Sequence, residues 1–391
     1  MKFKQGSPKH QVLVFAVFGL IAALVLSGCG SSTDTGDGAA AGSVTVTDIA
    51  GRQVTLKAPV ERMVLGEGRL LYLTALLDKE DPISGVVGWP DDLKKTDQAT
   101  FDKYEAKFPE IDRIPEIGSF TQGTVSQEKV IDLRPDVVIM TKDNYKGAQE
   151  IGAVATLEKV GIPTVVVDFR DEPLKSTVPG IELLGKITGR EAQAAAFTEF
   201  YDAQMKTITD RVAKTSTRPK TFLYTGAGLS DCCSTWGDAN LGSIVKFAGG
   251  ENLGTEIMPG AKGSVAEEQV FASNPDIIIV TGSDWRNQDK KREDVSYVNL
   301  GYEADPAQAR KQTDALMHEP GWGDLAAVKQ GRTHALWHQF YTSPYNFLAA
   351  QQIAKWQHPE AFGDVDPTQN FRELHEKFLP VEYSGTFWTQ S

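Results

Sequence analysis

EKVIDLRPDVVI, at residues 128–139, aligns without a gap with EQVFASNPDIII, at residues 268–279. In each copy a glutamate opens a helix of about two turns, a Pro-Asp pair closes it, and β-branched residues begin a strand. Pro-Asp before a strand is also common turn chemistry. Two matching windows with the glutamate at the same offset favour duplication or structural pseudo-symmetry. The repeat therefore predicts two lobes built on one plan.

The sequence around each copy alternates short β-branched runs with helical patterns. This alternation is typical of βα units and a largely parallel sheet. The expected strands lie at residues 62–65, 83–87, 136–140 and 163–167 in the first half and at 221–224, 276–280 and 334–337 in the second. The predicted fold class is α/β, with two Rossmann-like lobes of mainly parallel sheet.

The strongest helical pattern lies between the halves. Apolar residues recur at three- and four-residue spacing from Ala194 to Val212, and Pro219 ends the pattern. Thr188 followed by Glu191 fits a capping box at its start. A helix of this length measures on the order of 35 Å, which suits a rigid connection. We therefore predict an N-terminal lobe over 44–182, a connecting helix region over 183–215 and a C-terminal lobe over 216–391.

The N-terminal residues indicate export. A lysine-rich start precedes an uncharged run at residues 12–26, shorter than the roughly 20 residues that span a bilayer. The run ends in LSGC, which resembles the bacterial lipoprotein signal; the alternative is an ordinary secretory signal with an incidental cysteine. We predict a signal peptide over 1–28, lipidation of Cys29 and a flexible linker over 29–43, where Gly, Ser, Thr, Asp and Ala predominate.

Composition and motifs exclude several functions. Forty Lys and Arg against 52 Asp and Glu give a net charge of −12, the wrong sign for holding nucleic acid. No metalloprotease, nucleophile-elbow or phosphate-loop motif is present, and the histidines are scattered. We predict no catalytic residue, no metal site and no resident cofactor. The adjacent Cys232 and Cys233 are expected to form a vicinal disulfide, although redox or metal roles remain open.

The chain resembles the substrate-binding proteins of bacterial importers for iron chelates, haem and cobalamin, which have two lobes and one connecting helix. The motifs that carry the resemblance, besides the repeat, are TVTDIAGR at 45–52, PVERMV at 59–64, PEIG at 115–118, AGGEN at 248–252 and WHQFYTSPYN at 337–346. The last of these is most similar to the iron-complex branch. The resemblance implies a monomer, lipid-anchored at the cell envelope, that delivers a small-molecule metal chelate to an ABC permease dimer with its ATPase.

The resemblance also implies a role for the glutamates of the repeat. In the family such a pair docks into basic pockets on the permease, which here would be the role of Glu128 and Glu268. Two carboxylates on a rigid body suit a symmetric basic partner. The alternative is that each merely complements its helix dipole.

The expected ligand site lies beyond the carboxyl ends of the strands, between the lobes. Aromatic rings provide flat walls, and arginines provide donors for the anionic groups of a chelate. The candidates placed there are Arg69, Trp89, Arg170, Trp236, Trp285, Arg286, His338 and Tyr341. For each residue the alternative is structural, as a tryptophan at a core edge or an arginine facing water.

The expected function is capture of an iron-siderophore type chelate. Haem or cobalamin is the rival cargo, and a surface-anchored metal-dependent hydrolase or an adhesion lipoprotein is the rival class. The charged stretch at 286–316 is long for a connection and is expected to be a surface insertion or a flap over the ligand.

Overall fold

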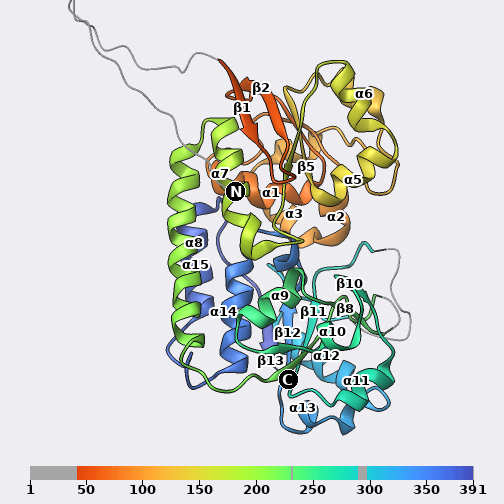
Figure 1. Cartoon of the computed structure of the whole chain (residues 1–391), viewed down its shortest axis with the longest axis vertical. Helices are drawn as coiled ribbons and strands as arrows, with labels where there is room; N and C mark the ends of the chain where they lie inside the picture. Colours follow the sequence, from red (N-terminus) through yellow and green to blue (C-terminus); the bar gives the residue numbers. More distant parts are fainter. Residues whose placement is uncertain (1–41, 230–231, 289–296, 391) are drawn as a thin grey trace, which may run out of the picture. The chain divides into compact units, whose positions relative to one another are not determined.

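The computed structural model describes residues 42–229, 232–288 and 297–390 (Figure 1). The predicted signal peptide, Cys29 and most of the predicted linker lie outside these described residues. Strand β1 (Gly42–Thr47) takes up the last residues of that linker and pairs with β2 (Gln53–Ala58) in an antiparallel hairpin. Within the described ranges, none of the helices combines the length and apolar character that a membrane crossing needs.

The first sheet is entirely parallel. Its strand order is β4 (Val86–Gly88), β3 (Met63–Leu65), β5 (Val137–Thr141) and β6 (Thr164–Val167). Three of the four predicted strands agree closely with these bounds. The strand predicted at 83–87 begins later, because Gly85 adopts a φ of 72° in a turn that precedes it.

The second sheet has the order β13 (Trp388–Gln390), β12 (Thr333–Trp337), β11 (Ile277–Gly282), β7 (Lys220–Tyr224) and β9 (Glu251–Asn252). All neighbours are parallel except β13, which runs antiparallel to β12. A separate two-stranded sheet pairs β8 (Ser234–Trp236) with β10 (Lys262–Ser264) in antiparallel orientation. The α/β fold class with mainly parallel sheets is therefore confirmed.

The sequence repeat has an equivalent structure in both sheets. The helix of each copy, α4 (Gln127–Asp132) or α11 (Glu267–Ser273), is followed by a left-handed residue, Arg134 at φ 47° or Asn274 at φ 41°. The aspartate of each Pro-Asp pair then accepts a backbone N–H from the start of the neighbouring strand. The two windows thus dock their strands by the same hydrogen bonds, which agrees with pseudo-symmetry.

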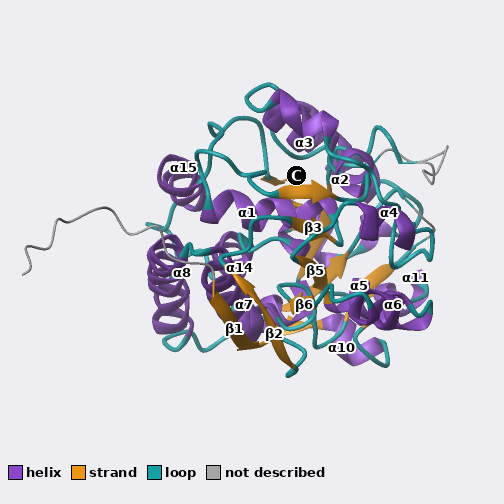
Figure 2. Cartoon of the chain, turned by 90° about the horizontal axis from the view of Figure 1, so that it is seen from above, coloured by secondary structure: helices purple, strands orange, loops and turns teal. Residues whose placement is uncertain are grey.

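Helices cover both faces of the sheets. In Figure 2, α7 (Pro173–Thr188) and α8 (Glu191–Val212) lie on one side of strands β3, β5 and β6, and α5 (Lys142–Glu150) and α6 (Ala153–Lys159) lie on the other. We call the elements from β1 to α7 the N-terminal lobe and those from β7 to β13 the C-terminal lobe. The helices are α1 (Leu71–Leu77), α2 (Asp92–Thr96), α3 (Gln98–Glu105), α5 (Lys142–Glu150), α6 (Ala153–Lys159), α7 (Pro173–Thr188), α8 (Glu191–Val212), α9 (Asn240–Phe247), α10 (Leu253–Ile257), α12 (Pro306–Met317), α13 (Ala326–Lys329), α14 (Asn346–Gln357) and α15 (Pro367–Phe378).

Helix α8 connects the lobes. Its Ala194 packs against Gly185 of α7, where a Cβ on the glycine would lie 2.5 Å from the alanine Cβ. Farther along, the Tyr201 hydroxyl donates to Asn346 Oδ1 of α14 at 2.8 Å, and Phe197 meets Phe378 of α15 edge to face. One helix therefore packs against elements of both lobes.

The prediction of a capping box at the start of α8 is wrong. Thr188 is the last residue of α7, and its hydroxyl donates to the Leu184 carbonyl at 2.7 Å. Gly189 then adopts a φ of 68°, so the chain turns before α8 begins at Glu191. Glycine at this position ends one helix and separates it from the next.

Candidate functional site

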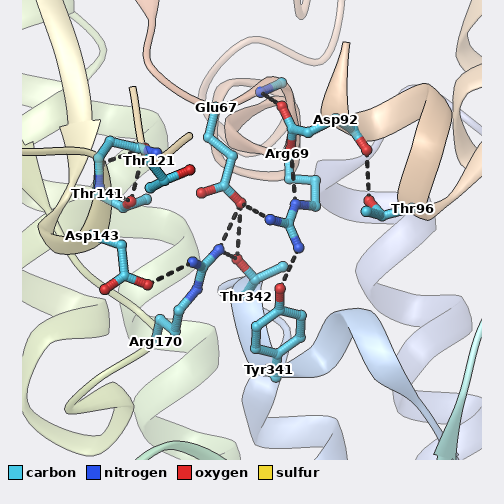
Figure 3. A network of polar contacts seen from close by, with 12 residues as sticks. Glu67, Arg69, Asp92, Thr96, Thr121, Thr141, Asp143, Arg170, Tyr341 and Thr342 are labelled. Atoms are coloured by element: carbon cyan, nitrogen blue, oxygen red, sulfur yellow. Dashed lines mark hydrogen bonds and ion pairs between the residues drawn. The ribbon is translucent and has the colours of Figure 1, made fainter. Parts of the chain in front are cut away.

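A buried carboxylate joins two arginines at the carboxyl edge of the first sheet (Figure 3). Glu67 and Arg69 follow β3, and Arg170 follows β6. Glu67 Oε1 accepts a hydrogen bond from Arg170 Nη2 at 2.6 Å and forms an ion pair with Arg69 Nη2 at 2.7 Å. Because the strands are parallel and adjacent strand ends meet at one edge, residues distant in sequence share a single oxygen.

Each arginine has a second carboxylate. Asp92, in the first turn of α2, lies 2.9 Å from Arg69 Nε and also accepts from the Gly68 N–H. Asp143, in the first turn of α5, lies 3.0 Å from Arg170 Nη1. The two guanidiniums are therefore fixed in position by carboxylates that flank them, with Glu67 between them.

The electrostatics favour an ionised Glu67. Only 4% of the residue is exposed, and this burial would raise its pKa. Arg170 and Arg69 outweigh burial and hold the pKa of the carboxyl below its ordinary value. The Glu67 carboxylate is therefore an internal counter-ion of both arginines. An anionic group of a ligand placed there would form the same contacts with the two guanidiniums.

The C-terminal lobe closes the arrangement from the other side. Arg69 Nη1 donates to the Tyr341 hydroxyl, and Arg170 Nη2 donates to Thr342 Oγ1 at 2.6 Å. Asn240, the first residue of α9, donates through Nδ2 to the backbone carbonyls of Arg170 at 2.8 Å and Tyr341 at 2.9 Å. The polar network therefore spans the boundary between the lobes.

The rings of Tyr341, His338 and Trp285 lie next to one another beside the arginines. The His338 ring lies 4.5 Å from the Tyr341 ring and 5.3 Å from the Trp285 ring, centroid to centroid. Its Nδ1 lies 2.8 Å from Thr281 Oγ1. Burial, together with Lys262 and both arginines, lowers the pKa of His338 to about 3. The ring is therefore neutral at pH 7 and adds no charge beside the arginines.

A cavity of about 380 Å³ opens next to this network. Besides Glu67, Arg69 and Arg170, its lining offers hydroxyl and amide groups that can bind oxygen-rich ligands. These polar lining residues are Thr96, Ser119, Thr121, Gln122, Asn144 and Gln288. Of them only Gln288 comes from the C-terminal lobe, so the N-terminal lobe forms most of the wall.

Five of the eight candidate ligand residues come together: Arg69, Arg170, Trp285, His338 and Tyr341 are linked by the contacts above. Trp89, Trp236 and Arg286 take other positions. Trp89 is 3% exposed and belongs to the apolar core, and Trp236 is 6% exposed with Lys262 over its ring at 5.0 Å. Arg286 pairs with Asp284 and Glu303.

The stretch at 286–316, expected to be an insertion or a flap, contains regular secondary structure. Its last part contains α12 (Pro306–Met317), and Gly301 pairs with Thr386 next to β13. Residues 289–296 lie outside the described part of the chain. Gln288, which precedes them, reaches the cavity lining.

Sequence reasoning missed Asp92, Asp143, Thr342 and Asn240. A usable signal existed for Asp143, because it follows β5 directly and strand ends mark ligand sites in such folds. The same signal existed for Asp92, which follows β4 by as many residues as Arg69 follows β3. Asn240 carried no such signal, because it acts through contacts with Arg170 and Tyr341, which lie far away in the sequence.

The two glutamates expected to dock with a permease are both exposed. Glu128 lies in the first turn of α4 and Glu268 in the first turn of α11. They occupy equivalent places in the two copies of the repeat, one on each lobe.

Two α/β lobes joined by a long helix, with a charged polar site at their boundary, define a solute-binding protein. The chain belongs to the Periplasmic binding protein family, whose model matches residues 71–336. The crystal structure of the TroA-like periplasmic binding protein FepB from Veillonella parvula superposes with a TM-score of 0.79, at 30% identity, over 89% of this chain and 99% of that one.

Two curated relatives are more distant. The molybdate-binding protein MolA of Haemophilus influenzae is 23% identical over 368 residues, which is 86% of this chain and 91% of MolA. An uncharacterized ABC transporter substrate-binding lipoprotein of Bacillus subtilis, YvrC, is 23% identical over 299 residues, which is 73% of this chain and 88% of YvrC.

Family membership settles the class. The chain is an exported, non-enzymatic component of an ABC transporter, and the hydrolase alternative is set aside. Its partners are a permease with its ATPase and a small-molecule ligand.

Proposed function

We propose that the chain captures a metal chelate of the iron-siderophore type between its lobes and delivers it, as a monomer, to the permease. One observation carries the proposal: Arg69 and Arg170 converge on a single carboxylate oxygen, with Tyr341 and Thr342 of the other lobe beside them. A ferric chelate presents anionic oxygens on a flat or rounded organic frame. The arginines suit those oxygens. The Tyr341 ring lies under both guanidiniums, 5.5 Å from that of Arg69 and 5.0 Å from that of Arg170, and supports them from the other lobe.

The MolA relative supports a second candidate, an oxyanion such as molybdate. The cavity wall combines arginines with hydroxyl and amide donors, among them Ser119, Thr121 and Asn144. Such donors can surround a small tetrahedral anion without any aromatic wall. The cavity volume of about 380 Å³ falls in the range of small-molecule sites and favours the larger chelate.

Tryptophan fluorescence tests the cargo, because Trp285 lies against His338. The purified chain would be titrated with ferric complexes of catecholate, hydroxamate and carboxylate chelators, with each chelator free of iron, and with haem, cobalamin and molybdate. Saturable quenching by one ferric chelate class, absent with the iron-free chelator, is the expected result. Saturation by haem, cobalamin or molybdate alone would overturn the proposed cargo.

Arg170→Gln provides the site-specific control. Loss of a charge-assisted hydrogen bond costs about 1.5–3 kcal/mol, so the affinity for the chelate should fall by roughly 10- to 100-fold. Arg211→Gln is the matched variant, because Arg211 pairs with exposed Asp364 and lies on α8. It should leave the affinity unchanged, whereas an equal loss in both variants would place the ligand elsewhere.

We also propose that Cys29 carries a lipid anchor. The LSGC sequence at residues 26–29 supports this, as does the lipoprotein name of the Bacillus subtilis relative. In a bacterial host, the wild-type chain should partition with membranes and incorporate labelled fatty acid. Cys29→Ser should lose both properties, and labelled fatty acid on the variant would contradict the assignment.

The exposed Glu128 and Glu268 are proposed as the permease contacts. Their equivalent placement in the two copies of the repeat supports a two-point dock on a permease dimer. Loss of cellular uptake with unchanged ligand affinity, on replacing both glutamates with alanine, is the result expected for this role.

A further inference from the structure

A second cluster of ligating groups lies outside the cavity. The nearest ligand atoms of Cys232, Cys233 and Glu267 all lie within 4.8 Å of one another. The cysteines are joined as a vicinal disulfide, as the sequence predicted. Neither the ligand network nor the family assignment gives this cluster a role.

The backbone holds the two sides of the cluster together. Cys233 N–H donates to the Val265 carbonyl at 3.0 Å, and Val265 N–H donates back to the Cys233 carbonyl at 3.0 Å. The ladder continues from Ser234 and Ser264 into strands β8 and β10. Glu267 begins α11 two residues after Val265. The cysteine pair and the carboxylate therefore belong to one hydrogen-bonded unit.

The Glu267 side chain is oriented by a buried indole. Trp322 Nε1 donates to Glu267 Oε1 at 3.3 Å, and only 1% of Trp322 is exposed. Stacking on Tyr224, with ring centroids 5.7 Å apart, fixes the indole in turn. A hydrogen-bond donor behind a carboxylate is the arrangement that orients metal-ligating carboxylates. Cys233 is fully buried, whereas Cys232 and Glu267 are half-buried, so the cluster is accessible from one side.

We propose that Cys232, Cys233 and Glu267 form a redox-dependent site for a thiophilic divalent cation. A small dithiol reduces the disulfide: it transfers two electrons and two protons, leaves as its own disulfide, and yields two cysteine thiols. The cation then displaces both thiol protons, forms two metal–sulfur bonds and takes an oxygen from Glu267. Thiolate sulfur with carboxylate oxygen suits zinc or cadmium, and water completes the coordination.

The site rests on different residues from those of the ligand network. Glu267 is the neighbour in sequence of Glu268, the proposed permease contact. A bound cation would therefore link the start of α11 to Cys232 and Cys233. Because the probe is a metal ion alone, the outcome does not depend on which solute the protein carries.

Cadmium titration tests the site. The full chain, with Cys29→Ser in every variant so that Cys232 and Cys233 are the only thiols, would be reduced, freed of reductant without oxygen and titrated with Cd²⁺. Thiolate-to-cadmium charge-transfer absorption in the ultraviolet reports binding to sulfur. We expect one Cd²⁺ per reduced chain and no band from the oxidised chain or from the double variant Cys232→Ser, Cys233→Ser.

Glu267→Gln should weaken Cd²⁺ binding by roughly tenfold or more. Loss of a residue that only hydrogen-bonds to a metal ligand already costs about that much, and Glu267 is proposed as a ligand itself. Glu268→Gln is the matched control, because its carboxylate is adjacent in sequence but outside the cluster, and it should bind as tightly as the parent. Circular dichroism would show that each variant is folded, and Cys232→Ser alone serves if the double variant is not. Absence of the band in the reduced chain, or equal affinity in Glu267→Gln and the parent, would overturn the site and leave the disulfide as a structural link only.

Discussion

Replacing Glu67 with glutamine tests the idea that this carboxylate is an internal counter-ion for the arginines. The amide keeps the shape of the side chain and removes the charge that Arg69 and Arg170 share at 2.7 and 2.6 Å. Breaking a buried ion pair costs about 3–5 kcal/mol. Asp92 and Asp143 still pair with one guanidinium each, so we expect a loss near the lower limit, about 3 kcal/mol.

The same variant should bind an anionic ligand more tightly. In the wild-type protein the ligand must compete with Glu67 for the two guanidiniums, whereas in Glu67→Gln it meets cations that lack their central partner. Each 1.4 kcal/mol recovered is tenfold in affinity, so a rise of about tenfold or more is expected. Urea unfolding with and without the ferric chelate that the wild-type chain binds measures the stability, and calorimetric titration measures Kd.

Glu172→Gln is the control for this experiment. Glu172 is an exposed carboxylate that pairs with Lys175 and Lys142, and exposed pairs contribute at most about 1 kcal/mol. A Glu67→Gln protein as stable as the wild type would refute the counter-ion reasoning. A folded variant that binds the chelate more weakly would show instead that the carboxylate itself contacts the cargo.

Three further predictions concern docking, acid stability and the lobe boundary. Glu128→Ala with Glu268→Ala should leave chelate affinity unchanged and abolish uptake by cells; a loss of affinity would refute the docking role. Burial lowers the pKa of His334 to about 3, so only the unfolded chain gains its proton as the pH falls below 6.5. This side chain therefore costs about 2 kcal/mol of stability between pH 7 and pH 5; His334→Phe should remove that part of the decline in urea unfolding, and an unchanged pH profile would contradict it. Asn240→Gly keeps the left-handed backbone, with φ at 49°, but loses the donors to Arg170 and Tyr341; unfolding should be easier by about 1–3 kcal/mol, and wild-type stability would show that the amide bridge contributes nothing.

The sequence by itself determined the helix–strand units of the repeat, the central strands of both sheets and the sheet edge at which polar residues gather. It did not predict strands β1, β2, β8, β9, β10 and β13. Hydrophobic runs and turn residues act locally, so the repeat at 128–139 and 268–279 predicted two helix–strand units that the structure contains. Parallel strands present their carboxyl ends at one edge, and Arg69 and Arg170 meet at Glu67 on that edge. The same local reasoning misplaced the start of α8, because Thr188 and Glu191 also satisfy a capping pattern when they belong to two successive helices.

Only the tertiary structure decided which of the strand-end residues meet. Glu67 and Arg170 are 103 residues apart, and Glu67 and Thr342 are 275 apart, so no local pattern relates them. Trp89 also follows a strand, yet it lies in the core rather than in the cavity wall. Residue type and strand position indicate which side chains can reach the edge of a sheet. The packing of distant segments decides which charges pair there. A buried carboxylate such as Glu67 needs charged partners, and only the folded chain brings those partners within hydrogen-bonding distance.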